Sequence, residues 1–266
     1  MHPHPNYKTY KMTVTQRTFR QHLLAKKQLV GTFQKTPSMM VSEVIASTSI
    51  DVVCIDAEHS PFDRRDLDST IFAYRSTDKP SLVRVQSGAA EHILNVLDCG
   101  ATGVVVPHVD SVEKAESIAK SARYGDMGRG YAGSTRAANY TGNTVSENLA
   151  NNKNNVVIAQ IEDLAALDEI DGIAVVEGID CLFIGMMDLT VALGCNSPKD
   201  QPVVDAAKKI CIAANKVDRR LGIFVADLND VGYWRELGVT LFLLGSEHGF
   251  IKQGINHLLA KTKPNK

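Results

Sequence analysis

The amino-acid sequence predicts a single (β/α)8 barrel. Its 266 residues are close to the roughly 250 that such a barrel typically uses. Short apolar runs alternate eight times with amphipathic segments, and no change in composition divides the chain in two. This alternation is typical of strands and helices that build a parallel sheet. We therefore expect one domain over residues 15–262, preceded by a flexible tail over residues 1–14.

The apolar runs are rich in valine and isoleucine, which is typical of strands buried on both faces of a parallel sheet. The predicted strands cover residues 29–34, 51–57, 81–85, 103–109, 156–162, 181–186, 221–227 and 239–245. A helix over residues 15–27 is expected to precede them. The other predicted helices cover residues 38–48, 63–75, 89–98, 111–122, 164–170, 203–217, 229–236 and 247–260. Ser111, before Val-Glu-Lys-Ala-Glu, is a typical N-cap for one of them.

Residues 123–154 interrupt the alternation of strands and helices, because loops between such elements usually have about 2–6 residues and this segment is far longer. The segment lies between a helix and the fifth strand, so we expect it at the end of the barrel where the strands begin. Its run Gly-Arg-Gly-Tyr-Ala-Gly-Ser-Thr-Arg (128–136) has the composition of a substrate loop. No Walker or dinucleotide-binding spacing is present in it, so the role of the segment stays open.

The overall composition excludes several classes of partner. Hydrophobic residues make up 44% of the chain, charged residues 22%, and the net charge is −1. These values are those of an ordinary globular protein and give no sign of nucleic acid or an anionic membrane as a partner. No apolar stretch reaches the roughly 18 residues of a membrane span. The polar N-terminus, with His2 and His4, is expected to be a disordered tail rather than a signal peptide or metal site.

The chain has five cysteines, which are scattered and form no Cys-x-x-Cys pair. This pattern predicts a reducing, cytoplasmic location and no disulfide framework or zinc site.

Two acidic residues point to a metal site. Glu162 ends the run 156–162, and Asp188 follows the run 181–186. Each therefore lies at the carboxyl end of a predicted strand, where barrel enzymes carry out their chemistry. Two carboxylates that converge there suit a hard divalent cation such as Mg²⁺ or Mn²⁺. For either residue alone, the alternative is a cap of the following helix.

Further candidate residues follow two other strands. Asp56, Glu58 and His59 end the second run, and His59 is a candidate general base beside these carboxylates. Arg84 lies inside the third run, where a guanidinium needs a partner, so it either pairs with an internal carboxylate or binds an anionic substrate. His108 is interpreted as a pocket-lining or packing residue.

A cation, a base and a buried arginine together indicate chemistry on a carbonyl group. The cation would polarise a 2-oxo acid, Arg84 would stabilise the enolate oxygen, and His59 would move the proton of the partner hydroxyl. A Schiff-base aldolase would need a lysine at a strand end instead. Lys35 is the one candidate, and Pro37 behind it indicates an ordinary turn.

Six motifs follow one another along the chain: Asp-Val-Val-Cys-Ile-Asp-Ala-Glu-His (51–59), Val-Arg-Val (83–85), Leu-Asp-Cys-Gly-Ala (97–101), Val-Val-Pro-His-Val (105–109), Gln-Ile-Glu (160–162) and Phe-Ile-Gly-Met-Met-Asp-Leu (183–189). In these motifs the chain resembles the HpcH/HpaI aldolases, the class II pyruvate aldolases that include 4-hydroxy-2-oxoheptanedioate and 2-keto-3-deoxy-L-rhamnonate aldolases. The resemblance runs from about residue 20 to residue 260, with the motifs in the family's order.

The resemblance implies a barrel of the phosphoenolpyruvate/pyruvate type and a divalent-metal cofactor (Mg, Mn or Co). It implies cleavage of a 4-hydroxy-2-oxo acid to pyruvate and an aldehyde through a metal-bound pyruvate enolate. The implied metal ligands are Glu162 and Asp188, with Asp56 acting through a water molecule.

The resemblance also implies roles for the other residues of the site. His59 would accept the proton, Asp98 would raise its basicity, and Arg84 would stabilise the transition state. Gln160 and the backbone of Met187 and Asp188 would bind the pyruvate part. A homo-oligomer is implied as well, a hexamer in which neighbours exchange the last helix.

The chain departs from the family at three places. Gly185-Met186-Met187-Asp188 replaces Gly-Pro-Ala-Asp, Tyr124-Gly125-Asp126 replaces Tyr-Pro-Pro, and Ser60 replaces a glycine. The positions of the metal ligands and the base are kept, while the walls around them change. We therefore expect a fixed pyruvate half and a preference for short or apolar aldehydes over long dicarboxylate-derived ones.

Two other functions remain possible at this stage. One is a carbon–carbon lyase acting on acyl-CoA, of the citrate-lyase β and malyl-CoA type, but no Lys/Arg cluster for the CoA phosphates is evident near a strand end. The other is a non-catalytic barrel that binds a 2-oxo acid. The partners expected for the favoured function are a small 2-oxo acid and an aldehyde.

Overall fold

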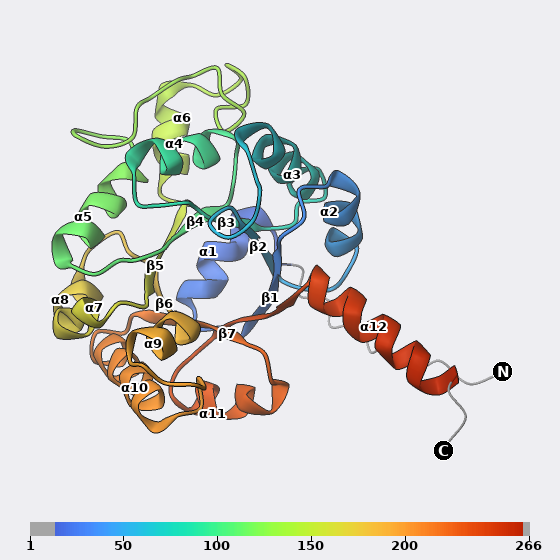
Figure 1. Cartoon of the computed structure of the whole chain (residues 1–266). Helices are drawn as coiled ribbons and strands as arrows, with labels where there is room; N and C mark the ends of the chain where they lie inside the picture. Colours follow the sequence, from blue (N-terminus) through green and yellow to red (C-terminus); the bar gives the residue numbers. More distant parts are fainter. Residues whose placement is uncertain (1–13, 263–266) are drawn as a thin grey trace.

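Eight parallel strands pair in sequence order and close into a barrel, with β1 hydrogen-bonded to β8 (Figure 1). The structure is a computed structural model and describes residues 14–262. The strands are β1 (Leu29–Gln34), β2 (Val52–Asp56), β3 (Ser81–Arg84), β4 (Gly103–Val106), β5 (Val156–Ile161), β6 (Cys181–Ile184), β7 (Arg220–Val225) and β8 (Leu241–Ser246). All eight predicted strands are confirmed, and so is the (β/α)8 fold class.

Helices surround the barrel and follow its strands in turn. They are α1 (Gln16–Leu24), α2 (Met39–Ala46), α3 (Arg64–Ser76), α4 (Ala90–Asp98), α5 (Val112–Ser121), α6 (Val145–Asn152), α7 (Leu164–Asp168), α8 (Ile170–Val175), α9 (Met186–Ala192), α10 (Gln201–Lys216), α11 (Val231–Glu236) and α12 (Glu247–Thr262), with a short 3₁₀ helix, η1 (Leu228–Asp230). The predicted cap of α5 is confirmed, because the Ser111 hydroxyl accepts a hydrogen bond from the Lys114 N–H at 3.3 Å.

Three helices lie outside the prediction. The sequence of α6 is polar, and α8 continues the α7 region beyond a break at Glu169. Helix α9 begins at Met186, two residues after β6, where the prediction extended the strand. The predicted tail over residues 1–14, with His2 and His4, lies outside the described residues except for Val14. The domain assignment stays a prediction.

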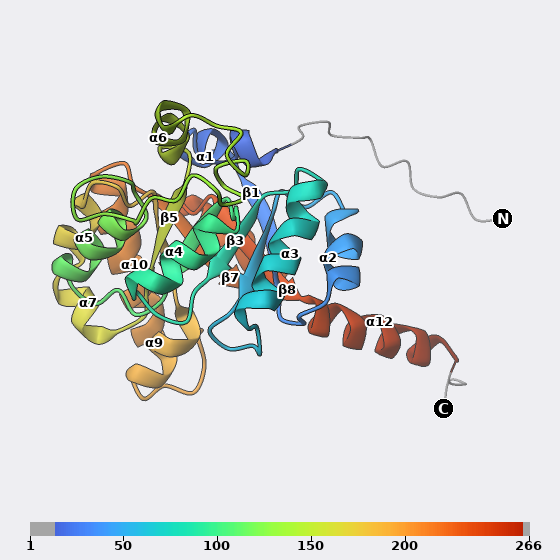
Figure 2. The ribbon, with the colours of Figure 1, turned by 90° about the horizontal axis from the view of Figure 1, so that it is seen from above.

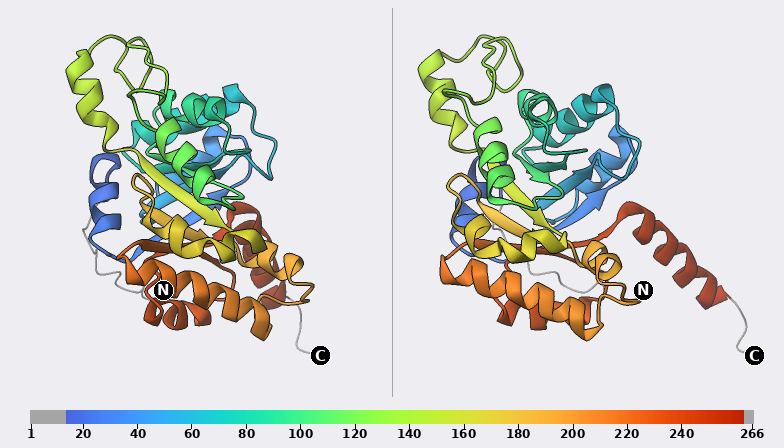
Figure 3. Two further views of the ribbon diagram at one scale, coloured as in Figure 1. Left: turned by 90° about the vertical axis from the view of Figure 1, so that its left-hand side faces the viewer. Right: turned by 60° about the vertical axis from the view of Figure 1, so that its left-hand side comes forward.

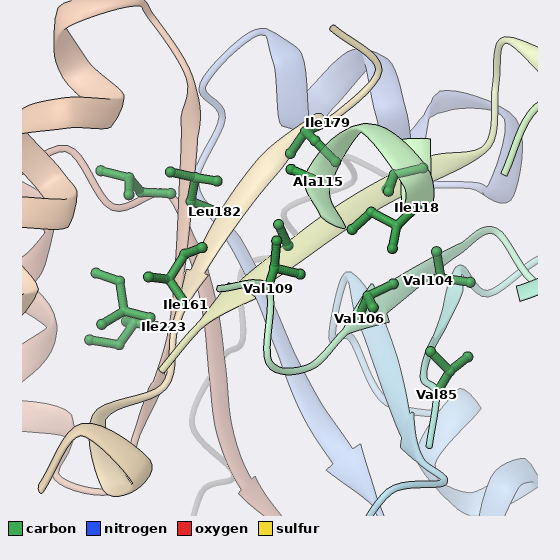
Figure 4. Packing of buried hydrophobic residues seen from close by; sticks show 14 of the residues in the cluster. Val85, Val104, Val106, Val109, Ala115, Ile118, Ile161, Ile179, Leu182 and Ile223 are labelled. Atoms are coloured by element: carbon green, nitrogen blue, oxygen red, sulfur yellow. The ribbon is translucent and has the colours of Figure 1, made fainter. Parts of the chain in front are cut away.

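Alternation along the strands divides the apolar side chains into two clusters. Val104, Val106 and Ile161 point outward and belong to one cluster with helix residues such as Ala115 and Ile118 (Figure 4). The inward-facing residues fill the barrel and include Cys54 and Cys181, which act there as small apolar side chains. Burial raises the pKa of the Cys54 thiol to about 12, so it stays protonated at neutral pH.

Helix α1 closes the end of the barrel at which the strands begin. Its Phe19 and Leu23 are fully buried in the same cluster as the inward-facing strand residues. Arg20 on the same helix forms an ion pair with the buried Asp180, just before β6, with 2.7 Å between Nη2 and Oδ1. Asp180 also accepts a hydrogen bond from the Val157 N–H at 3.0 Å. Helix α1 is thus bound to the barrel by apolar burial and by charge.

The long segment 123–154 lies at this same end, as expected. Figure 2 shows α6 and its loop on the side of α1, with α9 on the opposite side, and the left view of Figure 3 shows α1 and α6 together. Arg136 anchors the segment to helices α3 and α4, because its Nη1 donates hydrogen bonds to the backbone oxygens of Asp68 and Cys99. Within one chain the glycine-rich run 128–136 is therefore remote from the carboxyl ends of the strands.

Helix α12 projects away from the barrel (Figures 1 and 2). It carries five exposed apolar residues, namely Phe250, Ile251, Ile255, Leu258 and Leu259. Within residues 14–262, none of the helices combines the length and the apolar character that crossing a bilayer requires. The cytoplasmic location stays a prediction.

The closure by α1 is testable through stability. Phe19→Ala should lower the free energy of unfolding by about 3–5 kcal/mol, because it leaves a cavity in the barrel interior. Gln21→Ala, on the exposed side of the same helix, is the matched control and should change stability by less than about 0.5 kcal/mol. Urea unfolding of the three proteins measures both effects. Equal stability of the two variants would show that α1 is not part of the barrel core.

Candidate active site

A pocket of about 470 Å³ opens at the carboxyl ends of the strands. In barrels of this class, catalytic residues gather at that end. Residues that follow or end seven of the eight strands line the pocket. The polar lining residues are Lys35, Asp56, His59, Arg84, Gln160, Asp188 and Ser246.

An ion pair between Arg84 and Asp56 forms the base of one side of the pocket. The two residues are partners in the register of β2 and β3, and both side chains face the barrel interior. Arg84 Nε donates to Asp56 Oδ1 at 3.0 Å, and Nη2 lies 2.9 Å from the same oxygen. The Lys35 Nζ lies 2.9 Å from Asp56 Oδ2, and the His59 N–H donates to Oδ1 at 3.2 Å.

These contacts keep Asp56 ionised although it is fully buried. Burial raises the pKa of Asp56, but the charge of Arg84 and the hydrogen bonds from Lys35 and the His59 backbone lower it further, to below its ordinary value. Burial likewise lowers the pKa of Arg84, and the charge of Asp56 raises it above its ordinary value. Arg84 also lies over the Phe33 ring, with 4.9 Å from Cζ to the ring centroid. Both alternatives for Arg84 thus remain compatible with the geometry, since it pairs with a carboxylate and lines the pocket.

Glu58 connects this ion pair to two histidines. Its Oε2 lies 3.3 Å from Arg84 Nε and 3.6 Å from His59 Nε2. Its Oε1 lies 3.6 Å from Nε2 of His108. Burial raises the pKa of Glu58, although the charge of Arg84 opposes the rise. His59 is half exposed, so its ring is accessible to a substrate in the pocket.

Glu162 lies directly behind Gln160 and Gly185, which line the pocket, and is almost completely buried. Its Oε1 accepts a hydrogen bond from the His108 N–H at 2.8 Å, and its Oε2 accepts one from the Gln160 amide at 2.5 Å. Burial raises the pKa of Glu162 to about 7, against those two hydrogen bonds, and the charge of Asp188 adds to the rise. The confirmed alternation on β5 places Gln160 and Glu162 on one face.

Gly185 allows Glu162 to occupy this position. A Cβ atom on Gly185 would lie 2.6 Å from Glu162 Cβ and 2.7 Å from its Oε2, which is closer than side chains pack. Any larger residue at position 185 would therefore displace the carboxylate. This steric demand explains the glycine at the junction between β6 and α9 without any need for unusual backbone angles.

The donor set suits a divalent cation. Single ligand atoms of Glu58, His108 and Glu162 lie within 4.8 Å of one another. Two carboxylates line the pocket (Asp56 and Asp188), and two more, Glu58 and Glu162, lie next to its lining residues Arg84 and Gln160. Together they outnumber the cationic side chains Lys35 and Arg84 by two formal charges. The buried Oε1 of Gln160 has no hydrogen-bond partner among the described residues. A cation with charge +2 would balance this excess and would stabilise the ionised form of Glu162.

Most of the predicted site residues meet at this pocket. His59, Arg84, Gln160, Met187 and Asp188 line it. Asp188 is half-buried in the first turn of α9, where its charge acts on Glu162. The tight group of ligand atoms contains Glu162 with Glu58 and His108, whereas the sequence paired Glu162 with Asp188.

Asp98 is the predicted residue that the chain does not bring to the pocket. It is the last residue of α4, and α4 runs back toward the start of the barrel, where the Thr102 N–H donates to the Ser81 oxygen at the beginning of β3. His59 follows β2 at the opposite end. Within one chain Asp98 therefore lies far from His59, and its implied role in raising the basicity of His59 stays a prediction. Its nearest cation is instead Arg129, with 3.8 Å between Nε and Oδ1.

Three site residues were underestimated from the sequence. His108 has a positive φ of 54°, which turns its ring toward Glu58 and toward Asp163, whose Oδ2 lies 3.1 Å from Nδ1. The sequence presents Glu58 only as a neighbour of His59. It presents Lys35 as a Schiff-base candidate in an ordinary turn, whereas the structure pairs Lys35 with Asp56. Each of the three residues follows the end of a buried strand within a few positions in the sequence, and this position could have indicated a place in the site.

Comparison with known proteins agrees with this geometry. The family model described as HpcH/HpaI aldolase/citrate lyase matches residues 30–253. A hydroxypyruvate/pyruvate aldolase of Paraburkholderia phytofirmans is 32% identical over 227 residues, which cover 82% of this chain and 87% of that protein.

Two solved structures extend the comparison. An HpcH/HpaI aldolase/citrate lyase family protein from Burkholderia cenocepacia J2315 is similar with a TM-score of 0.88 and 27% identity, over 93% of this chain and 100% of that one. Citrate synthase SbnG is similar with a TM-score of 0.82 and 29% identity, over 91% of this chain and 96% of that one. With its barrel, its cluster of carboxylates at the strand ends and a family match over residues 30–253, the chain belongs to the HpcH/HpaI aldolase/citrate lyase family.

Proposed function

We propose that the chain is a class II, divalent-metal-dependent aldolase that cleaves a 4-hydroxy-2-oxo acid to pyruvate and an aldehyde. The observation that carries this proposal is the composition of the 470 Å³ pocket. One side holds the Arg84–Asp56 pair and His59. The other side holds Asp188, and Glu162 lies directly behind the lining residues Gln160 and Gly185, which gives this side an excess of negative charge. An anionic 2-oxo acid and a divalent cation can thus bind next to each other.

Glu162 and Asp188 would hold the cation, with Asp56 acting through a water molecule. Mg²⁺, Mn²⁺ or Co²⁺ suits such oxygen donors, and Glu58 and His108 are further donors within reach of Glu162. A cation bound there polarises the 2-oxo group of the substrate and reduces the free energy of the negative charge that develops on its oxygen.

The side chains of the pocket supply the remaining steps. His59 accepts the proton of the C4 hydroxyl, the C3–C4 bond breaks with its electron pair moving to C3, and the aldehyde leaves. Arg84 stabilises the negative charge on the C2 oxygen of the resulting enolate, and C3 takes up a proton to give pyruvate. Gln160 and the backbone N–H groups of Met187 and Asp188, which have no intrahelical acceptor in the first turn of α9, bind the carboxylate.

The pocket gives less support to a lyase that acts on acyl-CoA. Its lining contains two cationic side chains, Lys35 and Arg84, and both are engaged by Asp56. Phosphate groups of CoA would need cations without such partners. A non-catalytic 2-oxo-acid-binding barrel would have no use for a base at His59, whose half-exposed ring faces the substrate space.

We further propose that the chain forms a homo-oligomer, a hexamer by family resemblance. The exposed apolar residues of α12 support a second copy as its partner. Asp98 lies too far along α4 to act on His59 of its own chain, so any role in proton transfer requires an Asp98 from a neighbouring copy. The buried Oδ1 of Asp98 has no hydrogen-bond partner among the described residues.

Metal dependence is tested first. Activity on a panel of 4-hydroxy-2-oxo acids should disappear in excess chelator and return with Mg²⁺, Mn²⁺ or Co²⁺. Asp188→Asn should weaken divalent binding, measured by calorimetry, by more than about 10-fold, the scale on which even outer-sphere partners act. Asp171→Asn, an equal charge change at an exposed residue remote from the candidate ligands, is the control and should bind normally.

Other outcomes would change the assignment. If His108→Ala weakens binding and Asp188→Asn does not, the cation is held by the cluster of Glu58, His108 and Glu162. Full activity in chelator, with borohydride trapping of an adduct on Lys35, would show a Schiff-base aldolase instead.

The role of Arg84 is tested by kinetics. Arg84→Ala should lower kcat by about 10²–10³-fold, the scale for the loss of one preorganised donor. KM should rise less, because the enolate charge is greatest in the transition state. Arg17→Ala, at an exposed arginine of α1, is the control. If Arg84→Ala loses stability but keeps its kcat, the guanidinium is only the ion-pair partner of Asp56.

A role for Asp98 from a neighbouring copy is tested by mixing subunits. His59→Ala and Asp98→Asn chains should each be slow alone. Co-expressed, they should form mixed oligomers in which some sites combine an intact His59 with an intact Asp98, so part of the activity should return. If the activity of the mixture is only the average of the two variants, at an oligomeric state confirmed by light scattering, Asp98 has no role in a neighbour's site.

A further inference from the structure

A second, smaller pocket lies directly beside the catalytic pocket. Its volume is about 190 Å³, and it shares Met186, Met187 and Phe224 with the catalytic pocket. We call it the side pocket; its outer wall includes Val204 of α10 and Tyr233 and Trp234 of α11. The two pockets are therefore separated only by side chains that both of them contact.

The dividing wall is adaptable. Met187 is 57% exposed, and Met186 is partly buried against the core. Methionine has three rotatable bonds and a polarizable thioether, so it repacks around ligands of different shape at low cost. Phe224, the third shared residue, packs against Phe33 with 5.9 Å between the ring centroids. A ligand in the catalytic pocket can thus extend past the methionines while the aromatic part of the wall stays in place.

The chemical character of the side pocket is apolar inside and acidic at the rim. Tyr233 and Trp234 form an edge-to-face pair with 5.0 Å between their ring centroids. At the rim, Lys199 Nζ lies 3.1 Å from a carboxylate oxygen of Asp227 and 3.1 Å from one of Asp230. Two carboxylates against one ammonium leave the rim with a net negative charge. This disfavours an anionic group at the far end of a ligand.

The volume of the side pocket sets the size of its ligand. An apolar cavity of about 150 Å³ accommodates benzene. The 190 Å³ of the side pocket is thus enough for a phenyl ring or a short alkyl chain. Burial of such a group between methionine and aromatic side chains is favourable because it removes apolar surface from water.

We propose that the side pocket is the subsite for the substituent of the aldehyde, and that it selects uncharged apolar substituents of up to about phenyl size. This inference rests on the proposed aldolase function. In the addition direction, C3 of pyruvate loses a proton, C3 forms a bond to the aldehyde carbon, and the aldehyde oxygen takes up a proton. The substituent takes no part in these steps. It occupies the side pocket beyond Met186 and Met187, and so holds the aldehyde carbon next to C3.

The test compares acceptors on the metal-loaded full-length protein. The kcat/KM for addition of pyruvate to phenylacetaldehyde is divided by that for acetaldehyde, which is too short to reach the side pocket. Val204→Phe fills the pocket from a half-buried position on α10 and should lower this ratio by about 10-fold or more, the scale on which apolar pockets discriminate. Ile212→Phe makes a comparable change at an exposed position of the same helix and should leave the ratio as it is.

A second variant makes the result independent of how well Val204→Phe folds. Tyr233 is 42% exposed, so Tyr233→Ala removes part of the outer wall with little effect on the core. It should also lower the ratio, by a few-fold. An unchanged ratio in both folded variants, or a parent protein that works best with succinic semialdehyde, would overturn the inference.

A second measurement distinguishes failure of the proposed aldolase function from failure of the side-pocket inference. The enzyme with Mg²⁺ or Mn²⁺ should exchange the methyl protons of pyruvate with deuterium, a reaction that needs no aldehyde. The metal is removed after the reaction, and the exchange is then measured by NMR. If the parent shows neither this exchange nor addition to any acceptor, the aldolase function is wrong. If exchange and acetaldehyde addition proceed while the acceptor ratio is the same in every variant, only the side-pocket inference is wrong.

Discussion

The buried ion pair between Arg84 and Asp56 organises the catalytic end of the barrel. Removing two charges from water costs several kcal/mol, so such a pair persists only where further contacts compensate. Lys35 after β1 and the His59 backbone after β2 supply them, while Arg84 itself ends β3. Three neighbouring strand ends are thus tied to one carboxylate. The position of His59 follows directly from that carboxylate, through the hydrogen bond from its backbone to Asp56.

The charges of the pocket are unevenly divided as a result. Asp56 has cationic groups of Arg84 and Lys35 within 3.0 Å. Among the described residues, the ion-pair partner of Glu162 is Nδ1 of His108 at 3.5 Å, and Asp188 has none. This is why burial raises the pKa of Glu162 while the pKa of Asp56 is lowered. A substrate anion would bind near Arg84, and a metal cation would bind near Glu162 and Asp188, within the same pocket. The chemistry of the site is a consequence of this division more than of any single residue.

The fold and the strand-end residues followed from patterns that are local in the chain. Continuous valine and isoleucine runs mark strands of a parallel barrel, and alternation along β5 places Gln160 beside Glu162. The positions of two side chains, those of His108 and Asp98, do not follow from such local patterns, and the sequence did not predict them. The backbone of His108 turns at a positive φ, which sends its ring toward Glu58. Asp98 depends on the direction of α4, which carries it to the far end of the barrel. Helix α6 was missed because its residues are polar and its apolar periodicity is weak.

The closure of the barrel by α1 has a consequence for folding during synthesis. Helix α1 leaves the ribosome before any of the eight strands, but its Phe19 and Leu23 pack among residues as distant in sequence as Leu243. The pairing of β1 with β8 also spans almost the whole chain. Contacts of such long sequence separation form slowly. A nascent chain therefore exposes the apolar face of α1, with Phe19 and Leu23, until β8 has been made. Apolar surface exposed in such an interval favours chaperone binding or aggregation.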